Sequence, residues 1–184
     1  MSGKGSIHTM AAAVSRNEGK GTSLVLNIMG APIAQPAPRY HMLSKGYSAI
    51  YNPAQKQQAE LQNQLRNQLG LKGGNMYFNS ESGWIHIEMV HFFFRRPEYH
   101  FLSHRPRCFE NLKLKYRKEM IPYIHKPDVD NLEKFLFDVL QGVIYKDDRM
   151  LCKVSDAAKY YDSEGSCDGR TYIKVSLVDE QVEE

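Results

Sequence analysis

Apolar residues recur along the chain with two different spacings, and these spacings predict where helices and strands lie. From Leu132 to Leu140 the apolar positions are three or four residues apart, which predicts an amphipathic helix over about 131–141 that Gly142 ends. A second helix is predicted between Pro53 and Leu69, where leucines recur every four residues. Both segments carry one apolar face, so each helix is expected to pack against a neighbouring layer.

Runs rich in β-branched and aromatic residues predict strands between these helices. The longest run, 84–94, mixes polar and apolar side chains and is expected near the centre of a sheet. Shorter extended segments are predicted at 23–29, 47–51, 143–145, 150–160 and 171–178. Together these elements predict an α+β fold, a mixed β-sheet with helices packed on one side.

The chain length of 184 residues predicts a single folded domain, which we place at residues 22–178. Residues 1–21 are expected to be a flexible tail, and residues 179–184 an acidic tail. No apolar run approaches the roughly 20 residues that a membrane span needs. Three widely spaced cysteines favour a reducing compartment. An intracellular location in the cytoplasm, nucleoid or nucleus is expected, with mitochondrial targeting as the alternative because acids are scarce before Glu18.

Positive charge is concentrated in one segment, from Arg95 to Lys126. It holds nine Lys or Arg against three Glu, with aromatic residues between them, a mixture that suits a phosphate backbone. A solvated basic loop that binds nothing, whose aromatic residues are core anchors, is the alternative.

Two acids, Asp128 and Asp130, directly precede the helix predicted at 131–141. In an extended lead-in, alternation would place both side chains on the same side, where they can share one hard cation such as Mg²⁺. Asp147 or Asp148 is expected to supply a third carboxylate, because the chain reverses at Gly142. Helical spacing brings Lys134 within reach of Asp130, where its ammonium group can hold a phosphate.

Structural explanations for the same residues remain open. Asp130 followed by Glu133 is also the pattern of a capping box, and Asp147-Asp148 is also a turn sequence. Lys134 can equally serve as an ion-pair partner, and His125 is more typical of a loop than of a ligand.

The string HKPDVDNLEK from His125 to Lys134, followed by Asp138, Gly142 and the Asp147-Asp148 pair, resembles the signature of the RusA family of Holliday junction resolvases. A weaker likeness covers residues 22–178: Gly30, Pro32 and Pro38-Arg39 are similar to the family's N-terminal GxPxxKxRPR loop. The resemblance implies an α+β, intertwined homodimer that nicks four-way DNA junctions symmetrically with Mg²⁺, with Mn²⁺ as a substitute.

The resemblance also implies roles for individual residues. Asp128, Asp130 and Asp148 would be metal ligands, Asp147 a secondary carboxylate, and Lys134 the cation that faces the phosphate. Residues expected to contact DNA are Arg39, Lys113, Lys115, Arg117, Lys118 and Lys126. The sequence departs from the family at Gln35 and Ala37, where basic residues are usual. This departure is the support for an alternative function, a structure-selective DNA-binding protein with weak or no nuclease activity.

Overall fold

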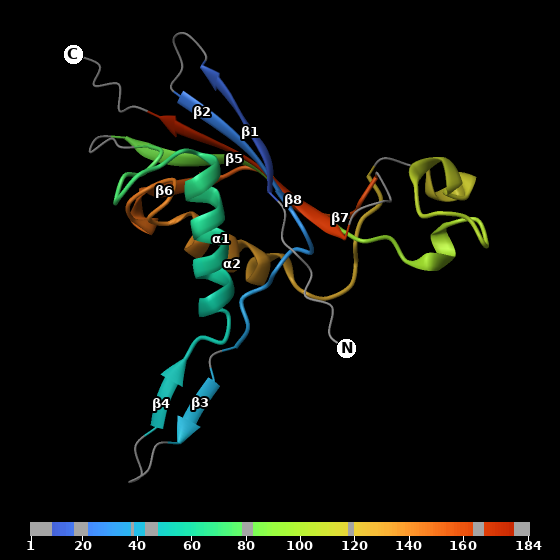
Figure 1. Ribbon diagram of the computed structural model, residues 1–184, viewed down its shortest axis with the longest axis horizontal. Helices are drawn as coiled ribbons and strands as arrows, with labels where there is room; N and C mark the ends of the chain where they lie inside the picture. The colour runs from blue at the N-terminus through green and yellow to red at the C-terminus, as the bar shows by residue number, and fades with distance from the viewer. Residues whose placement is uncertain are drawn as a thin grey trace.

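The computed structural model describes residues 9–16, 22–37, 39–42, 48–78, 83–117, 120–163 and 168–178. Within these ranges the chain forms strands, two α-helices and short 3₁₀ helices (Figure 1). The strands are β1 (Thr9–Arg16), β2 (Thr22–Met29), β3 (Arg39–Met42), β4 (Ser48–Tyr51), β5 (Trp84–Phe94), β6 (Leu151–Val154), β7 (Ala157–Tyr161) and β8 (Gly169–Val178). The helices are α1 (Gln55–Gln68), α2 (Val129–Leu140), η1 (Glu98–His100), η2 (Phe109–Asn111), η3 (Leu114–Tyr116) and η4 (Asp148–Met150).

The described strands form one mixed sheet and a separate hairpin. The sheet order is β1-β2-β8-β5-β6. β6 pairs with the first part of β5, and β7 pairs with the last part of β5. β2 and β8 are antiparallel to their neighbours, whereas β6 and β7 run parallel to β5. β5 therefore has neighbours along both of its edges, as its sequence predicted. Among the described residues, strands β3 and β4 pair only with each other, and their hairpin extends away from the sheet (Figure 1).

A bulge in β5 keeps its apolar side chains on one face. The pairing of β5 with β8 shifts between Ile87 and Met89. Without this extra residue, Val90 and Phe92 would face the opposite side from Ile85 and Ile87, because strand side chains alternate. All four side chains are instead buried in the same core. The bulge thus explains why the polar and apolar positions of this strand do not alternate regularly.

Both α-helices cover the same face of the sheet (Figure 1). The apolar stripe predicted for α2 is buried in the cluster that contains the inward side chains of β2, β5 and β8. α1 adds Leu61 and Leu65 to this cluster. Gly142 follows the helix with φ of 75°, a left-handed conformation that glycine adopts without strain, so α2 ends where the sequence predicted. The predicted α+β fold is confirmed.

Three sequence predictions about local structure were wrong. Residues 9–16, assigned to a flexible tail, form β1, which pairs with the edge of β2. Residues 143–145 form a turn, and their apolar character reflects burial beneath the end of α2. The segment predicted as one strand over 150–160 is broken at Ser155 and Asp156. The backbone of Ser155 donates to the Ile87 carbonyl and Asp156 accepts from Val90, so this break matches the β5 bulge.

The basic segment forms a small lobe, which we define as residues 95–127 and call the insert lobe (Figure 1). It has 3₁₀ helices and a buried centre of its own, in which Phe101 and Leu112 are almost fully buried. Arg96, which is 1% exposed, joins the lobe to the sheet because its guanidinium group donates to the carbonyls of Asp162 and Tyr116. In the described part of the chain, no helix has the length and apolar character needed to cross a membrane.

The packing of α2 leads to a stability prediction. Leu132 is fully buried, so Leu132→Ala should lower the free energy of unfolding by about 2–5 kcal/mol through lost burial and a residual cavity. Leu114, which is 82% exposed in the insert lobe, is the matched control, and Leu114→Ala should change stability by no more than about 0.5 kcal/mol. Urea unfolding followed by circular dichroism measures both. Equal losses in the two variants would contradict the packing described for α2.

Candidate active site

The loop before α2 is held from two sides by residues that the sequence analysis did not single out. The ammonium group of Lys159, on β7, donates to the carbonyls of His125 at 2.8 Å and Pro127 at 2.6 Å. The Tyr123 hydroxyl donates to the Lys126 carbonyl at 3.2 Å, and its ring stacks on Phe94. The backbone leading to Asp128 is therefore fixed to the sheet.

Asp128 and Asp130 both lie at the N-terminus of α2, but not in the extended lead-in that the sequence predicted. The helix begins at Val129, so Asp128 is its N-cap and Asp130 lies in its first turn. The prediction that strand-like alternation aligns the two side chains is therefore wrong. Both residues are exposed, and the N-terminal end of a helix favours carboxylates because its unpaired N–H groups carry partial positive charge.

The capping-box explanation of these acids does not hold. Asp130 is inside the helix rather than at its N-cap, and the Asp128 side chain makes no capping hydrogen bond. Glu133 is half-buried, and its pKa is raised first by burial and then by the neighbouring charge of Asp130. Capping hydrogen bonds therefore do not account for the two exposed carboxylates.

Lys134 pairs with Asp130, and Asp138 joins the two helices. The Lys134 ammonium lies 3.3 Å from a carboxylate oxygen of Asp130, and both side chains are more than 60% exposed. The Asp138 carboxylate accepts a hydrogen bond from Gln58 of α1 at 3.0 Å. Lys134 and Asp130 thus pair with each other, whereas Asp138 contacts α1.

The two acids after α2 have different surroundings. Asp147 caps η4, and its carboxylate accepts hydrogen bonds from the backbone and the guanidinium group of Arg149. These bonds hold the pKa of Asp147 well below its usual range. Asp148 is exposed, and its charge contributes, after burial and Asp138, to raising the pKa of the buried Tyr145. The Asp147 carboxylate is therefore held by Arg149, whereas Asp148 is exposed and interacts with the Asp147 side chain.

The predicted carboxylates do not form a ready-made cage. Among the residues that the structure describes, no group of three or more His, Cys, Asp or Glu side chains is placed to hold a metal ion together. The arrangement instead provides a pair of exposed acids, Asp128 and Asp130, with a lysine beside them. This donor set consists of carboxylate oxygens, which are the ligands that Mg²⁺ and Mn²⁺ prefer.

The loop after β2 passes beside the start of α2. The backbone N–H of Gln35 donates to the Asn131 carbonyl at 2.8 Å. The side-chain oxygen of Gln35 is buried without a hydrogen-bond partner in the described part of the chain. Arg39 is exposed at the start of β3. The position at which the sequence lacks an expected basic residue thus lies next to the candidate acids.

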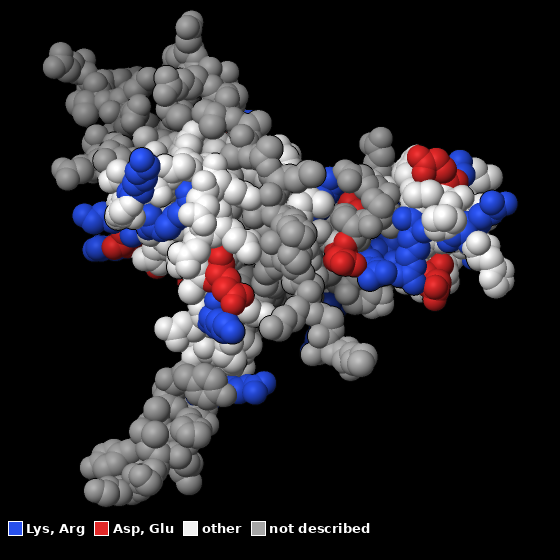
Figure 2. All heavy atoms as spheres, viewed as in Figure 1, with Lys and Arg blue, Asp and Glu red and all other residues white. Residues whose placement is uncertain are grey.

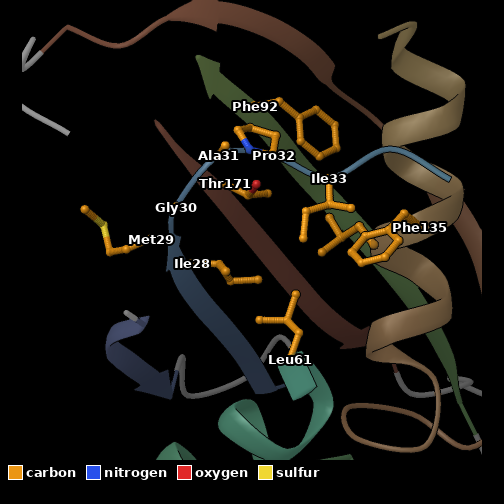
Figure 3. A pocket seen from close by; sticks show the side chains of 11 residues that line it. Ile28, Met29, Gly30, Ala31, Pro32, Ile33, Leu61, Phe92, Phe135 and Thr171 are labelled. Atoms are coloured by element: carbon orange, nitrogen blue, oxygen red, sulfur yellow. The ribbon is translucent and has the colours of Figure 1, made fainter. Parts of the chain in front are cut away.

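A small cavity lies beneath this loop, but its chemistry does not suit a reaction (Figure 3). Its volume is about 20 Å³, and its lining is mostly apolar, including Ile28, Ile33 and Phe135. This is room for about one water molecule. The cavity is therefore a gap in the packing between the loop and α2.

The model of the family described as endodeoxyribonuclease RusA matches residues 30–176, which include every acid of the candidate site. The chain belongs to the RusA family. A search of curated proteins found no match. The family resemblance read from the sequence is confirmed by the family model. RusA-family endodeoxyribonucleases act on branched DNA junctions. The match begins at the loop beside α2 and ends within β8, and it spans both the acidic site and the insert lobe.

The basic residues expected to contact DNA in this RusA-family chain differ in their availability. Lys115 and Lys126 are exposed, Lys113 is partly exposed, and Lys115 also lies over the Tyr116 ring. Arg117 instead donates to the carbonyls of Leu112 and Glu110, so its guanidinium group maintains the fold of the insert lobe. Lys118 lies outside the described residues. Figure 2 shows Lys and Arg atoms gathered on the insert lobe.

His100 lies at the centre of the insert lobe, where its ring stacks on Tyr116. It is 3% exposed, and burial, followed by the charges of Arg96, Lys115 and Lys113, lowers its pKa to about 4. The folded protein therefore binds a proton at this ring more weakly than an unfolded chain, whose histidines titrate near pH ~6.5. The stability that the neutral ring provides is complete above about pH 6.5 and is lost as the pH falls toward 4.

This lowered pKa can be measured directly. In an NMR titration, the Cε1 proton of His100 should show a midpoint near pH 4. Lys115→Gln should raise that midpoint, because it removes one of the positive charges that disfavour the protonated ring. A Lys72→Gln variant, altered outside the insert lobe, should leave it unchanged. A midpoint near pH 6.5 in the unaltered protein would show that the ring is not buried.

Proposed function

We propose that this chain is a divalent-metal-dependent endodeoxyribonuclease that resolves four-way DNA junctions by paired nicks, with Asp128 and Asp130 as the centre of its active site. The observation that carries the proposal is the pair of exposed carboxylates at the N-terminus of α2, which no capping role explains. Membership of the RusA family makes phosphodiester hydrolysis in branched DNA the matching chemistry.

The donor set suits Mg²⁺, for which Mn²⁺ can substitute. Mg²⁺ retains several waters and is usually held by only one or two protein carboxylates together with substrate phosphates, so a preformed three-acid cage is not required. When bound, such an ion polarises the phosphate and lowers the pKa of a coordinated water. Asp128 and Asp130 would hold the ion. Asp148 is the preferred third ligand because its carboxylate is exposed, whereas Asp147 caps η4 and accepts hydrogen bonds from both the backbone and the side chain of Arg149.

Lys134 would bind the scissile phosphate and stabilise the negative charge that develops on it. Its present partner does not prevent this, because an ion pair as exposed as Lys134–Asp130 contributes only about 0–1 kcal/mol. A phosphate placed beside Asp130 can therefore compete for the ammonium group. In this proposal the ion pair orients Lys134 before the substrate binds.

The DNA path would extend from the acids over the exposed cations. Lys126 immediately precedes the site, Arg39 lies on the β3–β4 hairpin, and Lys113 and Lys115 lie on the insert lobe. These contacts would be to phosphates, which position the DNA without reading its sequence. Two cuts in a two-fold symmetric junction require two sites, so we propose that the active form is a homodimer.

A second candidate is a structure-selective DNA-binding protein without nuclease activity. It is favoured by Gln35, which contacts the start of α2 at a position where the family usually carries a basic residue. This candidate predicts junction binding without cleavage.

One cleavage assay separates the two candidates. Immobile and mobile four-way junctions and a linear duplex are incubated with Mg²⁺ or Mn²⁺ and with the unaltered protein, Asp128→Asn, Asp130→Asn or Asp148→Asn. Paired nicks should appear only in junctions, and each substitution should slow nicking about a hundredfold or more while junction binding persists. Glu60→Gln, an exposed acid on α1, is the matched control and should retain activity. Junction binding without nicking by the unaltered protein would favour the second candidate.

Lys159 should act as a positioning residue in this nuclease. Lys159→Met removes both hydrogen bonds to the loop before Asp128 but keeps the length of the side chain. A displacement of the acids by about 1 Å should reduce kcat roughly a hundredfold with little change in junction affinity. Lys159→Arg should recover part of the activity, since its guanidinium group can donate to the same carbonyls.

Lys153→Met, at an exposed position on β6, is the control for loss of a positive charge near the sheet edge. Equal losses of kcat in Lys153→Met and Lys159→Met would show that charge, rather than the position of the loop, matters at Lys159.

A further inference from the structure

The insert lobe contains an open groove that shares only Lys113 with the DNA path proposed above. Its volume is about 680 Å³, within the range of about 300–1,000 Å³ that is usual for small-ligand sites. It is lined by η1, by the loop that follows it and by Lys113. None of Asp128, Asp130, Lys134 or Asp148 lines it.

One wall of the groove offers an aromatic ring that is both exposed and held in place. Tyr99 is 59% exposed. The edge contacts of its ring are with His100, at a centroid distance of 4.7 Å, and with Tyr116, at 6.2 Å. His100 is itself buried and stacked on Tyr116, so the ring that supports Tyr99 is fixed in the centre of the lobe. Leu102, which is 45% exposed, adds an apolar surface to the groove.

The charge of the groove is positive. Its lining contains Arg105, Arg107 and Lys113 but only one acid, Glu98. Glu98 pairs with Arg107 at 2.9 Å. Within the described ranges, neither Arg105 nor Lys113 forms an ion pair with a carboxylate. Two positive charges therefore remain available for an anion that lies along the groove.

We propose that this groove binds an unpaired stretch of one or two nucleotides of DNA. Base stacking on Tyr99 would supply one part of the binding, and Arg105 and Lys113 would contact the backbone phosphates. An exposed aromatic ring inside a positively charged groove is the combination that binds single strands without sequence preference. A duplex keeps its base faces stacked on each other, so Tyr99 distinguishes unpaired from paired DNA. The inference rests on the proposed action on branched DNA, and it requires that base pairs open at the branch point when the protein binds.

The test is a binding measurement made without cleavage. Fluorescence anisotropy of a labelled ten-nucleotide oligo(dT) is followed with the full chain in a chelator, with the unaltered protein and the variants Tyr99→Leu, Tyr99→Phe and Arg105→Gln. Tyr99→Leu should weaken binding about tenfold or more, whereas Tyr99→Phe, which keeps the ring, should bind like the unaltered protein. Arg105→Gln should reduce the slope of log affinity against log salt by about 0.7, the value for one lost phosphate contact with a single strand.

Lys72→Gln, an exposed lysine outside the insert lobe, is the matched control for Arg105→Gln and should change neither affinity nor slope. Equal effects of Lys72→Gln and Arg105→Gln, unchanged binding in Tyr99→Leu, or no binding of oligo(dT) by the folded protein would each overturn the proposal. The proposal would also be overturned if polyglutamate displaced oligo(dT) equally well from the unaltered protein and from Tyr99→Leu, since charge alone would then explain binding in the groove.

Failure of the groove proposal and failure of the nuclease proposal give different experimental results. Oligo(dT) binding that depends on Tyr99, together with no nicking of junctions, would support the groove and reject the nuclease. Junction nicking together with oligo(dT) binding that is insensitive to Tyr99 would support the nuclease proposal and reject the groove proposal.

Discussion

The burial of one face of α2 is the constraint on which the rest of the site depends. Five apolar side chains of this helix are buried against the sheet, and such a stripe fixes how the helix is rotated about its axis. The opposite face must then carry Asp130 and Lys134 to the surface. The position of the candidate acids is therefore set by apolar packing that does not itself touch the substrate.

Periodicity in the sequence was sufficient to predict the elements but not how they begin. The stripe from Leu132 to Leu140 predicted α2, and the length and composition of 84–94 predicted β5. The sequence did not show that α2 begins at Val129, because Asp128 and Asp130 carry no apolar signal that separates a helix turn from an extended lead-in. β1 was missed for a similar reason, since its small residues do not alternate with polar ones.

Residues that act through distant contacts were the least predictable part of the site. The acids were found because they are close in sequence, whereas Lys159 reaches the same loop from more than 30 residues away. Its only signal is a single lysine in a strand of small and aromatic residues. The roles of Arg149 and Arg117 were not predicted either, although their partners lie only two to seven residues away, because hydrogen bonds to Asp147 and to backbone carbonyls depend on the local fold.

The order of strands in the sheet has a consequence for the synthesis of the protein. β8 is the last of the described strands along the chain, yet it lies between β2 and β5 and pairs with both along almost its whole length. Until its residues have left the ribosome, β2 and β5 lack the neighbour that joins them, and much of the apolar face beneath α2 cannot close. Because these pairings span most of the sequence, the domain should fold slowly and only after translation of residues 169–178.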